Sequence, residues 1–257
     1  MGTWTSVSTP IGMPGHWQSM TSFTQGKTTV YAAISYLTEP NGKSAIYISK
    51  DDGKTWNKSM SAGIRSWQNN ISSASDGVNS IIIAPVSAGY IYTSTDLGDT
   101  WQSNEPVNSS TMQVWNSLVS FPDGNNITEI AVPKETAESD RYLKISRDAG
   151  MTWSPLSSAG QDSWSSIASS TSSNHTVLAA ASLTGSGGTI YISTDLGQTW
   201  SHYTPASVPY GWESISVATD NTRTVIAAIA KNRDGTASVF TSSDLGTTWV
   251  EKPLPNS

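Results

Sequence analysis

Apolar and polar residues alternate in short runs along the whole chain, and turn-forming residues separate the runs. One stretch shows this clearly, with the runs WSSIASS (164–170), TVLAAASL (176–183), TIYIST (189–194) and TWSHYTP (199–205). The segments SSNH, TGSGG and DLGQ between them are rich in residues that favour turns. Alternation with a period of two places every second side chain on one face, so the stretch predicts four short antiparallel strands.

This four-strand unit occurs five times. A ten-residue segment that closes each unit reads YISKDDGKTW, YTSTDLGDTW, KISRDAGMTW, YISTDLGQTW or FTSSDLGTTW, and ends at Trp56, Trp101, Trp153, Trp200 and Trp249. A second tryptophan series opens the units, at Trp17, Trp67, Trp115, Trp164 and Trp212. A four-stranded repeat of about 40–50 residues is the signature of a β-propeller blade.

The repeats predict an all-β protein with a single domain over residues 1–257, a five-bladed β-propeller of four-stranded antiparallel blades. The blades are expected near residues 11–60, 61–108, 109–158, 159–206 and 207–257. Residues 1–10 resemble a spare outer strand, which we expect to close the ring by pairing with the last blade. The segment Thr248–Pro255, interrupted by two prolines, would then be displaced or only partly paired, although the reverse arrangement is also open.

The shared pattern Ser-x-Asp-x-Gly-x-Thr-Trp fits a hairpin turn. The carboxylate can accept hydrogen bonds from N–H groups of the turn, and glycine can take the positive φ that the turn requires. The five segments resemble the Asp-box, or bacterial neuraminidase, repeat. In that family the box lies away from the active site, so the resemblance implies a structural role for Asp51, Asp96, Asp148, Asp195 and Asp244.

The face opposite the Asp boxes is the expected binding face, because the variable loops meet there. Each opening tryptophan of the second series is followed by a polar residue, which gives the candidate pairs Trp17–Gln18, Trp67–Gln68, Trp115–Asn116, Trp164–Ser165 and Trp212–Glu213. An aromatic ring beside amide, hydroxyl or carboxylate groups suits a sugar ligand. The hypothesis is a multivalent lectin that binds glycans or glycoconjugates. The alternative is that the five rings are blade-to-blade core.

The residues that sialidase chemistry needs are not apparent. That chemistry uses three arginines and a Tyr–Glu pair, and the chain has no RIP segment. Arg147 lies inside an Asp box, away from the expected binding face. We therefore expect no catalysis. Two alternatives stay open, a protein-interaction scaffold and a glycoside hydrolase with one asymmetric carboxylate site.

Composition narrows the other classes. The formal net charge is −6 without a basic cluster, which argues against nucleic-acid binding. No apolar run approaches the roughly 18 residues of a membrane span, and the start of the chain does not resemble a signal peptide. The chain has no cysteine, and His16, His175 and His202 do not have metal-ligand spacing, so we expect no metal or cofactor. A soluble monomer is expected, and its compartment is not predicted.

Overall fold

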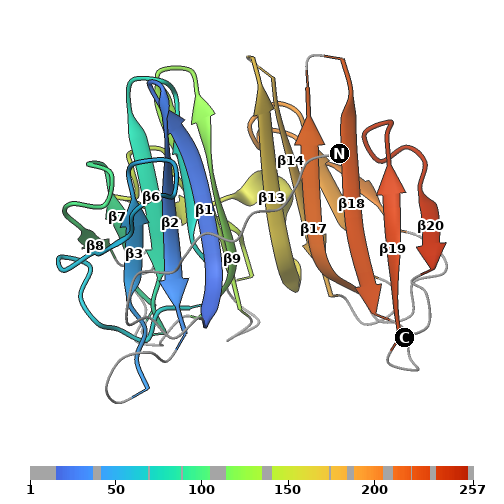
Figure 1. Ribbon diagram of the computed structural model, residues 1–257. Coiled ribbons are helices and arrows are strands. Elements are labelled where there is room, and N and C mark those ends of the chain that lie inside the picture. The colour runs from blue at the N-terminus through green and yellow to red at the C-terminus, as the bar shows by residue number, and fades with distance from the viewer. Residues whose placement is uncertain are drawn as a thin grey trace.

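The computed structural model describes residues 16–36, 42–68, 70–87, 89–104, 114–134, 141–173, 175–183, 188–204, 211–220, 222–231 and 236–253. These residues form five sheets of four antiparallel strands (Figure 1). The predicted all-β architecture of five four-stranded blades is confirmed.

The strands follow one another in chain order within each blade. Blade 1 contains β1 (Trp17–Gln25), β2 (Thr28–Ser35), β3 (Ile46–Ser49) and β4 (Asn57–Lys58). Blade 2 contains β5 (Ser72–Ser75), β6 (Ser80–Pro85), β7 (Ile91–Ser94) and β8 (Gln102–Asn104). Blade 3 contains β9 (Trp115–Asp123), β10 (Asn126–Pro133), β11 (Lys144–Ser146) and β12 (Ser154–Pro155), followed by a short 3₁₀ helix (Ser157–Ala159). Blade 4 contains β13 (Trp164–Ser172), β14 (His175–Ser182), β15 (Ile190–Ser193) and β16 (Ser201–Tyr203). Blade 5 contains β17 (Trp212–Thr219), β18 (Thr224–Lys231), β19 (Ala237–Ser242) and β20 (Val250–Pro253).

The core lies between the blades rather than within any one of them. Four buried hydrophobic clusters each join two consecutive blades, from blades 1 and 2 to blades 4 and 5. Strand β14 shows why its sequence is a continuous apolar run. Val177 and Ala179 pack toward blade 5, whereas Leu178 and Ala180 pack toward blade 3. A strand that is covered on both faces has no polar face.

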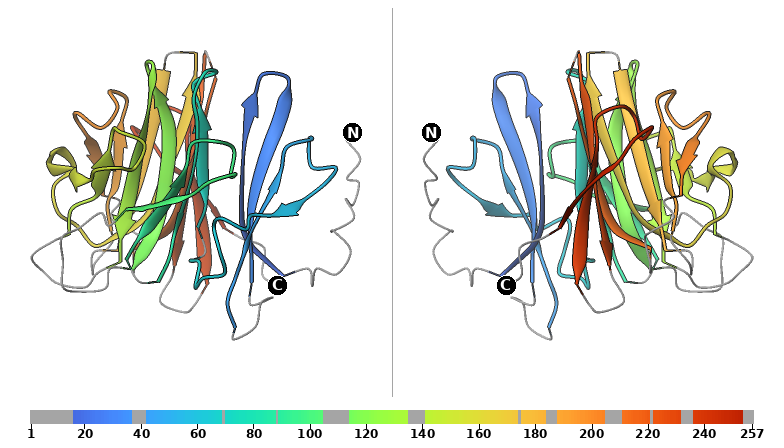
Figure 2. Two further views of the ribbon diagram at one scale, coloured as in Figure 1. Left: turned by 90° about the vertical axis from the view of Figure 1, so that its left-hand side faces the viewer. Right: turned by 90° about the vertical axis from the view of Figure 1, so that its right-hand side faces the viewer.

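In each blade, the first hairpin joins the first and second strands, and the Asp box joins the third and fourth. Because consecutive strands are antiparallel, these two turns lie at the same end of the blade. Figures 1 and 2 show the blades standing roughly side by side, with the hairpins between their first two strands at the same end. The five Asp boxes and five hairpins therefore gather at one end of the molecule, here called the Asp-box end.

Each Asp box is a network of local hydrogen bonds. In blade 4, Asp195 accepts hydrogen bonds from the hydroxyl of Ser193 at 2.7 Å and from the N–H of Thr199 at 2.9 Å. The Thr199 hydroxyl bonds the other carboxylate oxygen, and the indole N–H of Trp200 donates to the carbonyl of Gly197 at 3.2 Å. The same set of contacts recurs in the other four blades.

These hydrogen bonds predict how the fold responds to acid. The hydroxyl and then the N–H of Thr199 hold the pKa of Asp195 at about 2, below its ordinary value of 3.8. A lowered pKa contributes stability that is present above pH 3.8 and is lost as the pH falls toward 2. We expect Asp195→Asn to be less stable than the wild type at pH 6, with the difference narrowing between pH 4 and pH 2. Urea unfolding followed by circular dichroism at these pH values measures it, and a difference that does not narrow would contradict the prediction.

The last blade takes its outer strand from the C-terminal segment. This strand, β20, pairs antiparallel with β19 over Val250–Pro253, which is one of the arrangements that the sequence left open. Residues 1–10, predicted to close the ring, lie outside the described residues. Among the described residues, no fifth hydrophobic cluster joins blade 5 to blade 1, and Met20 and Ile229 on these two blades are 61% and 39% exposed.

Candidate functional site

Four of the five tryptophans predicted to contact a ligand are core side chains. Trp67 and Trp115 are each 4% exposed, and Trp164 and Trp212 are 1% and 0% exposed. A ring this deeply buried has no free face for stacking on a sugar. For these four rings the packing favours the alternative, blade-to-blade core, over the predicted stacking on a sugar. Trp17 differs, with 37% of its surface exposed.

The difference follows from the position of Trp17 in the first blade. Its ring contacts Tyr47 edge-on at a centroid distance of 5.6 Å and Trp56 at 5.9 Å, both in its own blade. In blade 2, Trp67 makes corresponding contacts with Tyr92 and Trp101 but is also buried in the cluster shared with blade 1. No described residue covers Trp17 in the same way from blade 5.

The polar residues that follow the tryptophans mostly hold neighbouring segments together. The Gln68 side-chain oxygen accepts a hydrogen bond from the N–H of Trp115 in the next blade, at 3.1 Å. The Asn116 amide donates to the carbonyl of Trp164 at 3.0 Å, again in the next blade. Ser165 bonds the carbonyl of Ala181 within its own blade. Gln18 is half-buried on blade 1, and Glu213 is exposed on blade 5.

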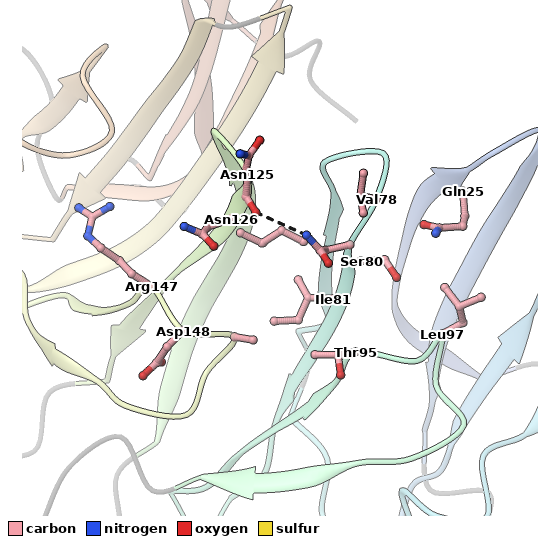
Figure 3. Close-up of a pocket in the computed structure, with 13 residues that line it drawn as sticks. Gln25, Val78, Ser80, Ile81, Thr95, Leu97, Asn125, Asn126, Arg147 and Asp148 are labelled. Atoms are coloured by element: carbon pink, nitrogen blue, oxygen red, sulfur yellow. Dashed lines mark hydrogen bonds between the residues drawn. The ribbon is translucent and has the colours of Figure 1, made fainter.

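A cleft of about 370 Å³ lies between blades 2 and 3 at the Asp-box end (Figure 3). We call it the blade 2–3 cleft. Its lining comes from the first hairpins of blades 1, 2 and 3 and from the Asp boxes of blades 2 and 3, and consists of Gln25, Val78, Asn79, Ser80, Ile81, Thr95, Leu97, Asn125, Asn126, Ile127, Arg147, Asp148 and Ala149.

The lining combines an apolar floor with polar walls. Ile81 and Ile127 are buried and form part of the cluster between blades 2 and 3. The polar groups of the lining include the side-chain amides of Gln25, Asn79 and Asn126 and the guanidinium of Arg147. Amides offer donors and acceptors together, and the guanidinium offers donors only.

The turn between β5 and β6 holds Asn79 in place. The carboxylate of Asp76 accepts hydrogen bonds from the N–H groups of Val78 at 2.8 Å and Asn79 at 2.6 Å. The Asn79 amide donates to Asp76 at 2.9 Å and to the carbonyl of Asn125 at 3.4 Å, the dashed line in Figure 3. Burial raises the pKa of Asp76, but the hydrogen bonds from Asn79 and Val78 outweigh burial and hold the pKa below 3.8. The acceptor is therefore charged at neutral pH.

Arg147 precedes the aspartate of the blade 3 box and is anchored beside the cleft. Its Nη1 lies 2.9 Å from Oδ2 of Asp123, which also accepts a hydrogen bond from Thr128. The Arg147 side chain remains 48% exposed, so much of the guanidinium surface stays open to solvent.

A second hollow of about 520 Å³ borders the other side of the same turns. It is lined by Ser75, Asp76, Pro122, Asp123, Gly124, Thr171, Ser173, Thr176 and Leu196. Its polar groups are hydroxyls and two carboxylates, without an amide or a cation. This hollow lies next to the blade 2–3 cleft and reaches from the turns of blades 2 and 3 to those of blade 4.

Sequence reasoning missed the cleft because it placed binding at the opposite end. Much of that end, including residues 37–41, 105–113, 135–140, 184–187, 205–210 and 232–235, lies outside the described residues, and pockets there stay a prediction. One signal for the cleft was available. Arg147 occupies the box position that Thr95 and Thr194 occupy in the flanking blades.

Neither a metal-binding cluster nor a membrane-spanning helix is present in the described part of the chain. Within it, no group of three or more histidine, aspartate or glutamate side chains is placed to hold a metal ion. No helix there has the length and apolar character that crossing a membrane requires.

Comparisons with known proteins agree with this architecture. The family model for the BNR/Asp-box repeat matches residues 47–58, and the model "Sortilin, neurotensin receptor 3" matches residues 141–253. A search of the curated proteins finds no match.

Solved structures share the fold at low sequence identity. A six-bladed β-propeller lectin of Aleuria aurantia, described with its fucose recognition mode, matches with a TM-score of 0.53 and 12% identity over 92% of this chain and 78% of the lectin. The Dos1 propeller matches with a TM-score of 0.55 and 11% identity over 90% of this chain and 56% of that chain. Trypanosoma rangeli sialidase matches with a TM-score of 0.51 and 15% identity over 92% of this chain. This chain spans about half of the latter two structures, 56% and 48%.

The sheets, their order and these matches define the class of protein as a β-propeller. Within that class, the chain carries five boxes of the Asp-box kind, and the BNR/Asp-box repeat model matches the first of them over residues 47–58.

Proposed function

We propose that the protein is a non-catalytic carbohydrate-binding protein and that it binds a sugar in the blade 2–3 cleft. The observation that carries the proposal is the grouping of side-chain amides around an apolar floor, with Arg147 at the edge of the lining. A sugar hydroxyl donates and accepts hydrogen bonds at once, as an amide does, and the C–H face of a sugar ring suits an apolar surface. The match to a lectin supports the fold on which this site is built.

The carboxylate of the cleft lining favours binding over hydrolysis. Burial alone would raise the pKa of Asp148, but hydrogen bonds from Thr152 and Ser146 outweigh burial and hold the pKa below 3.8. Both of its oxygens are occupied by hydrogen bonds within the box. A general acid for glycoside cleavage needs a raised pKa, so Asp148 does not suit that role.

The proposed site occurs once per chain. The position of Arg147 is taken by Lys50, Thr95, Thr194 and Ser243 in the other boxes, and the position of Asn126 is taken by Thr28, Ser80, His175 and Thr224 in the other second strands. This combination of amides and guanidinium therefore predicts one sugar per chain at this end. The five-site arrangement expected at the opposite end stays a separate prediction.

A glycan-array screen followed by titration calorimetry tests the proposal. We expect a stoichiometry of one at this cleft and at least a tenfold loss of affinity in Asn126→Ala and in Arg147→Ala, since each removes a directional polar contact. The matched controls are His175→Ala and Thr194→Ala, which change the corresponding positions of blade 4. Binding that survives both cleft variants would place the sugar elsewhere, and an array without any hit would contradict the proposed function.

A further inference from the structure

A buried carboxyl group lies in the blade 2–3 junction, in a place where the other blades have apolar residues. Glu129 on β10 pairs with Ser146, the first serine of the blade 3 box. The residues that pair with this serine in the other blades are Tyr31, Ile82, Leu178 and Ile226. Glu129 is 0% exposed, and neither of its carboxyl oxygens has a hydrogen-bond partner among the described residues.

A second polar substitution faces the same junction. Thr93 on β7 of blade 2 stands where β3, β11 and β15 have Ile48, Ile145 and Ile192, and where β19 of blade 5 also has a threonine. Its hydroxyl is likewise buried without a partner in the described part of the chain. Thr93 also touches the blade 3 box closely, because a Cβ atom built on Gly150 would lie 2.5 Å from its hydroxyl oxygen. Two polar side chains thus lie beneath one Asp box, Glu129 against Ser146 and Thr93 against Gly150.

This place lies directly below the blade 2–3 cleft. Ile127, on the cleft floor, is two residues before Glu129 on β10 and therefore points to the same side of the sheet. The box above it supplies the cleft wall formed by Arg147, Asp148 and Ala149. A change at Glu129 is therefore transmitted to the wall through one short turn.

We propose that Glu129 is a proton-controlled element of the cleft. With its proton, the neutral carboxyl group lets the blade 3 box pack on blade 2. When the proton leaves to solvent, an uncompensated negative charge remains in the junction, the box loosens and the cleft loses its shape. The loosening of the blade 3 box depends only on Glu129, whereas the effect of Glu129 on sugar binding rests on the proposed function.

The surroundings favour the neutral form over a wide pH range. Burial, with a smaller contribution from the charge of Asp148, raises the pKa of Glu129 from 4.5 to about 8, although the nearby Ser146 hydroxyl and Gly150 N–H act in the opposite direction. Among the described residues, the charged groups on the adjoining segments are Lys144 on β11 and Arg147 and Asp148 in the box. Neither carboxyl oxygen of Glu129 accepts a hydrogen bond from these groups, and Arg147 is paired with Asp123. From blade 2, the residues facing the junction are Ile81, Ile83 and Thr93, none of which titrates.

The sign of the pH dependence follows from the raised pKa. Below pH 4.5 both the folded and unfolded states keep the proton, so the carboxyl group adds no penalty. Between pH 4.5 and about 8 only the unfolded state loses the proton, and the unfolding equilibrium constant rises up to about tenfold per pH unit. Above about pH 8 the folded state loses it too, and the charge is then buried in the folded protein.

Hydrogen exchange of the intact protein between pH 6 and pH 9 tests the loosening of the box without any ligand. The readout is the exchange rate of the Gly150 and Thr152 amides divided by that of Gly197 and Thr199 in the blade 4 box, where Leu178 occupies the position of Glu129. The ratio removes the intrinsic rise of exchange with pH. We expect it to increase severalfold above pH 8 in the wild type and to stay constant in Glu129→Leu and in Glu129→Gln. A wild-type ratio that does not change with pH would overturn the proposal.

Urea unfolding and ligand titration separate this inference from the proposed function. The unfolding constant of Glu129→Leu is expected to rise less steeply with pH than that of the wild type, and equal slopes would count against a raised pKa. For a glycan that binds the cleft, the wild-type Kd should increase severalfold from pH 7 to pH 9 and that of Glu129→Leu should not. If exchange at the box depends on pH but no glycan binds, the proton-controlled element stands and the proposed function fails. If a glycan binds and both exchange and affinity are independent of pH, only the inference fails.

Discussion

Trp164→Ala is expected to lower the free energy of unfolding by about 3–5 kcal/mol, the usual loss for a fully buried aromatic residue. The Trp164 ring is 1% exposed, lies 4.6 Å from the Tyr191 ring between centroids and donates its indole N–H to the carbonyl of Arg141 at 2.8 Å. Its removal leaves a cavity and takes one of two hydrogen bonds from the Arg141 carbonyl, which keeps the bond from the N–H of Asp162. Urea unfolding followed by circular dichroism is the suitable measurement, because ten other tryptophans would obscure a fluorescence signal.

The matched control is Trp17→Ala, which changes the corresponding position of blade 1. Because Trp17 is 37% exposed, we expect this variant to lose about 1 kcal/mol. Equal losses at the two positions would contradict the prediction and would mean that Trp17 is covered by a part of the chain outside the described residues. If Trp17→Ala instead keeps its stability and abolishes sugar binding, the site expected at the opposite end is supported.

The blade architecture was predictable because the contacts that fix each turn lie within a short stretch of the repeat. The contacts that fix the turn, such as those of Asp195 with Ser193 and Thr199, span at most four residues. A short window of sequence therefore contains both partners of each hydrogen bond. The five copies then give the number of blades, and alternating polarity gives the strands.

The exposure of each opening tryptophan was not predictable from its own repeat. Trp17 and Trp164 have similar local sequences, and both begin the inner strand of a blade. What differs is whether a preceding blade covers the ring, which is a contact between residues about one repeat apart. The sequence therefore left the core and ligand interpretations open, and packing distinguishes them.

The cleft was hidden for a related reason, since Gln25, Asn79, Asn126 and Arg147 come from turns of three different blades. Their proximity depends on the packing of blades 1, 2 and 3. Comparison of the repeats with one another nevertheless points to this junction. Arg147 and Glu129 each replace a residue type that the equivalent positions of the neighbouring blades share. Such departures from a repeat identify places where function or regulation can override the scaffold.

The close approach of successive blades predicts a second large effect, at the glycine of an Asp box. Gly98 in blade 2 has φ +87°, and a Cβ atom built on it would lie 2.7 Å from Cγ1 of Ile48 in blade 1. Gly197 in blade 4 has nearly the same φ, +83°, but its nearest neighbours would lie at 3.7 Å. An alanine would therefore be strained by the left-handed backbone at both positions, but its methyl group would clash with a neighbour only at Gly98.

Alanine at these two glycines should separate the two contributions. Gly197→Ala is expected to lose about 1–2 kcal/mol of unfolding free energy through the left-handed backbone alone. Gly98→Ala should lose a further 1–3 kcal/mol, approximately, because Ile48 must move within a packed junction. Urea unfolding of both variants measures the difference. Combining Gly98→Ala with Ile48→Ala should recover the additional part, since the truncated side chain no longer meets the new methyl group. Equal losses for the two glycine variants, or a double variant whose losses simply add, would show that blades 1 and 2 are not in close contact at this box.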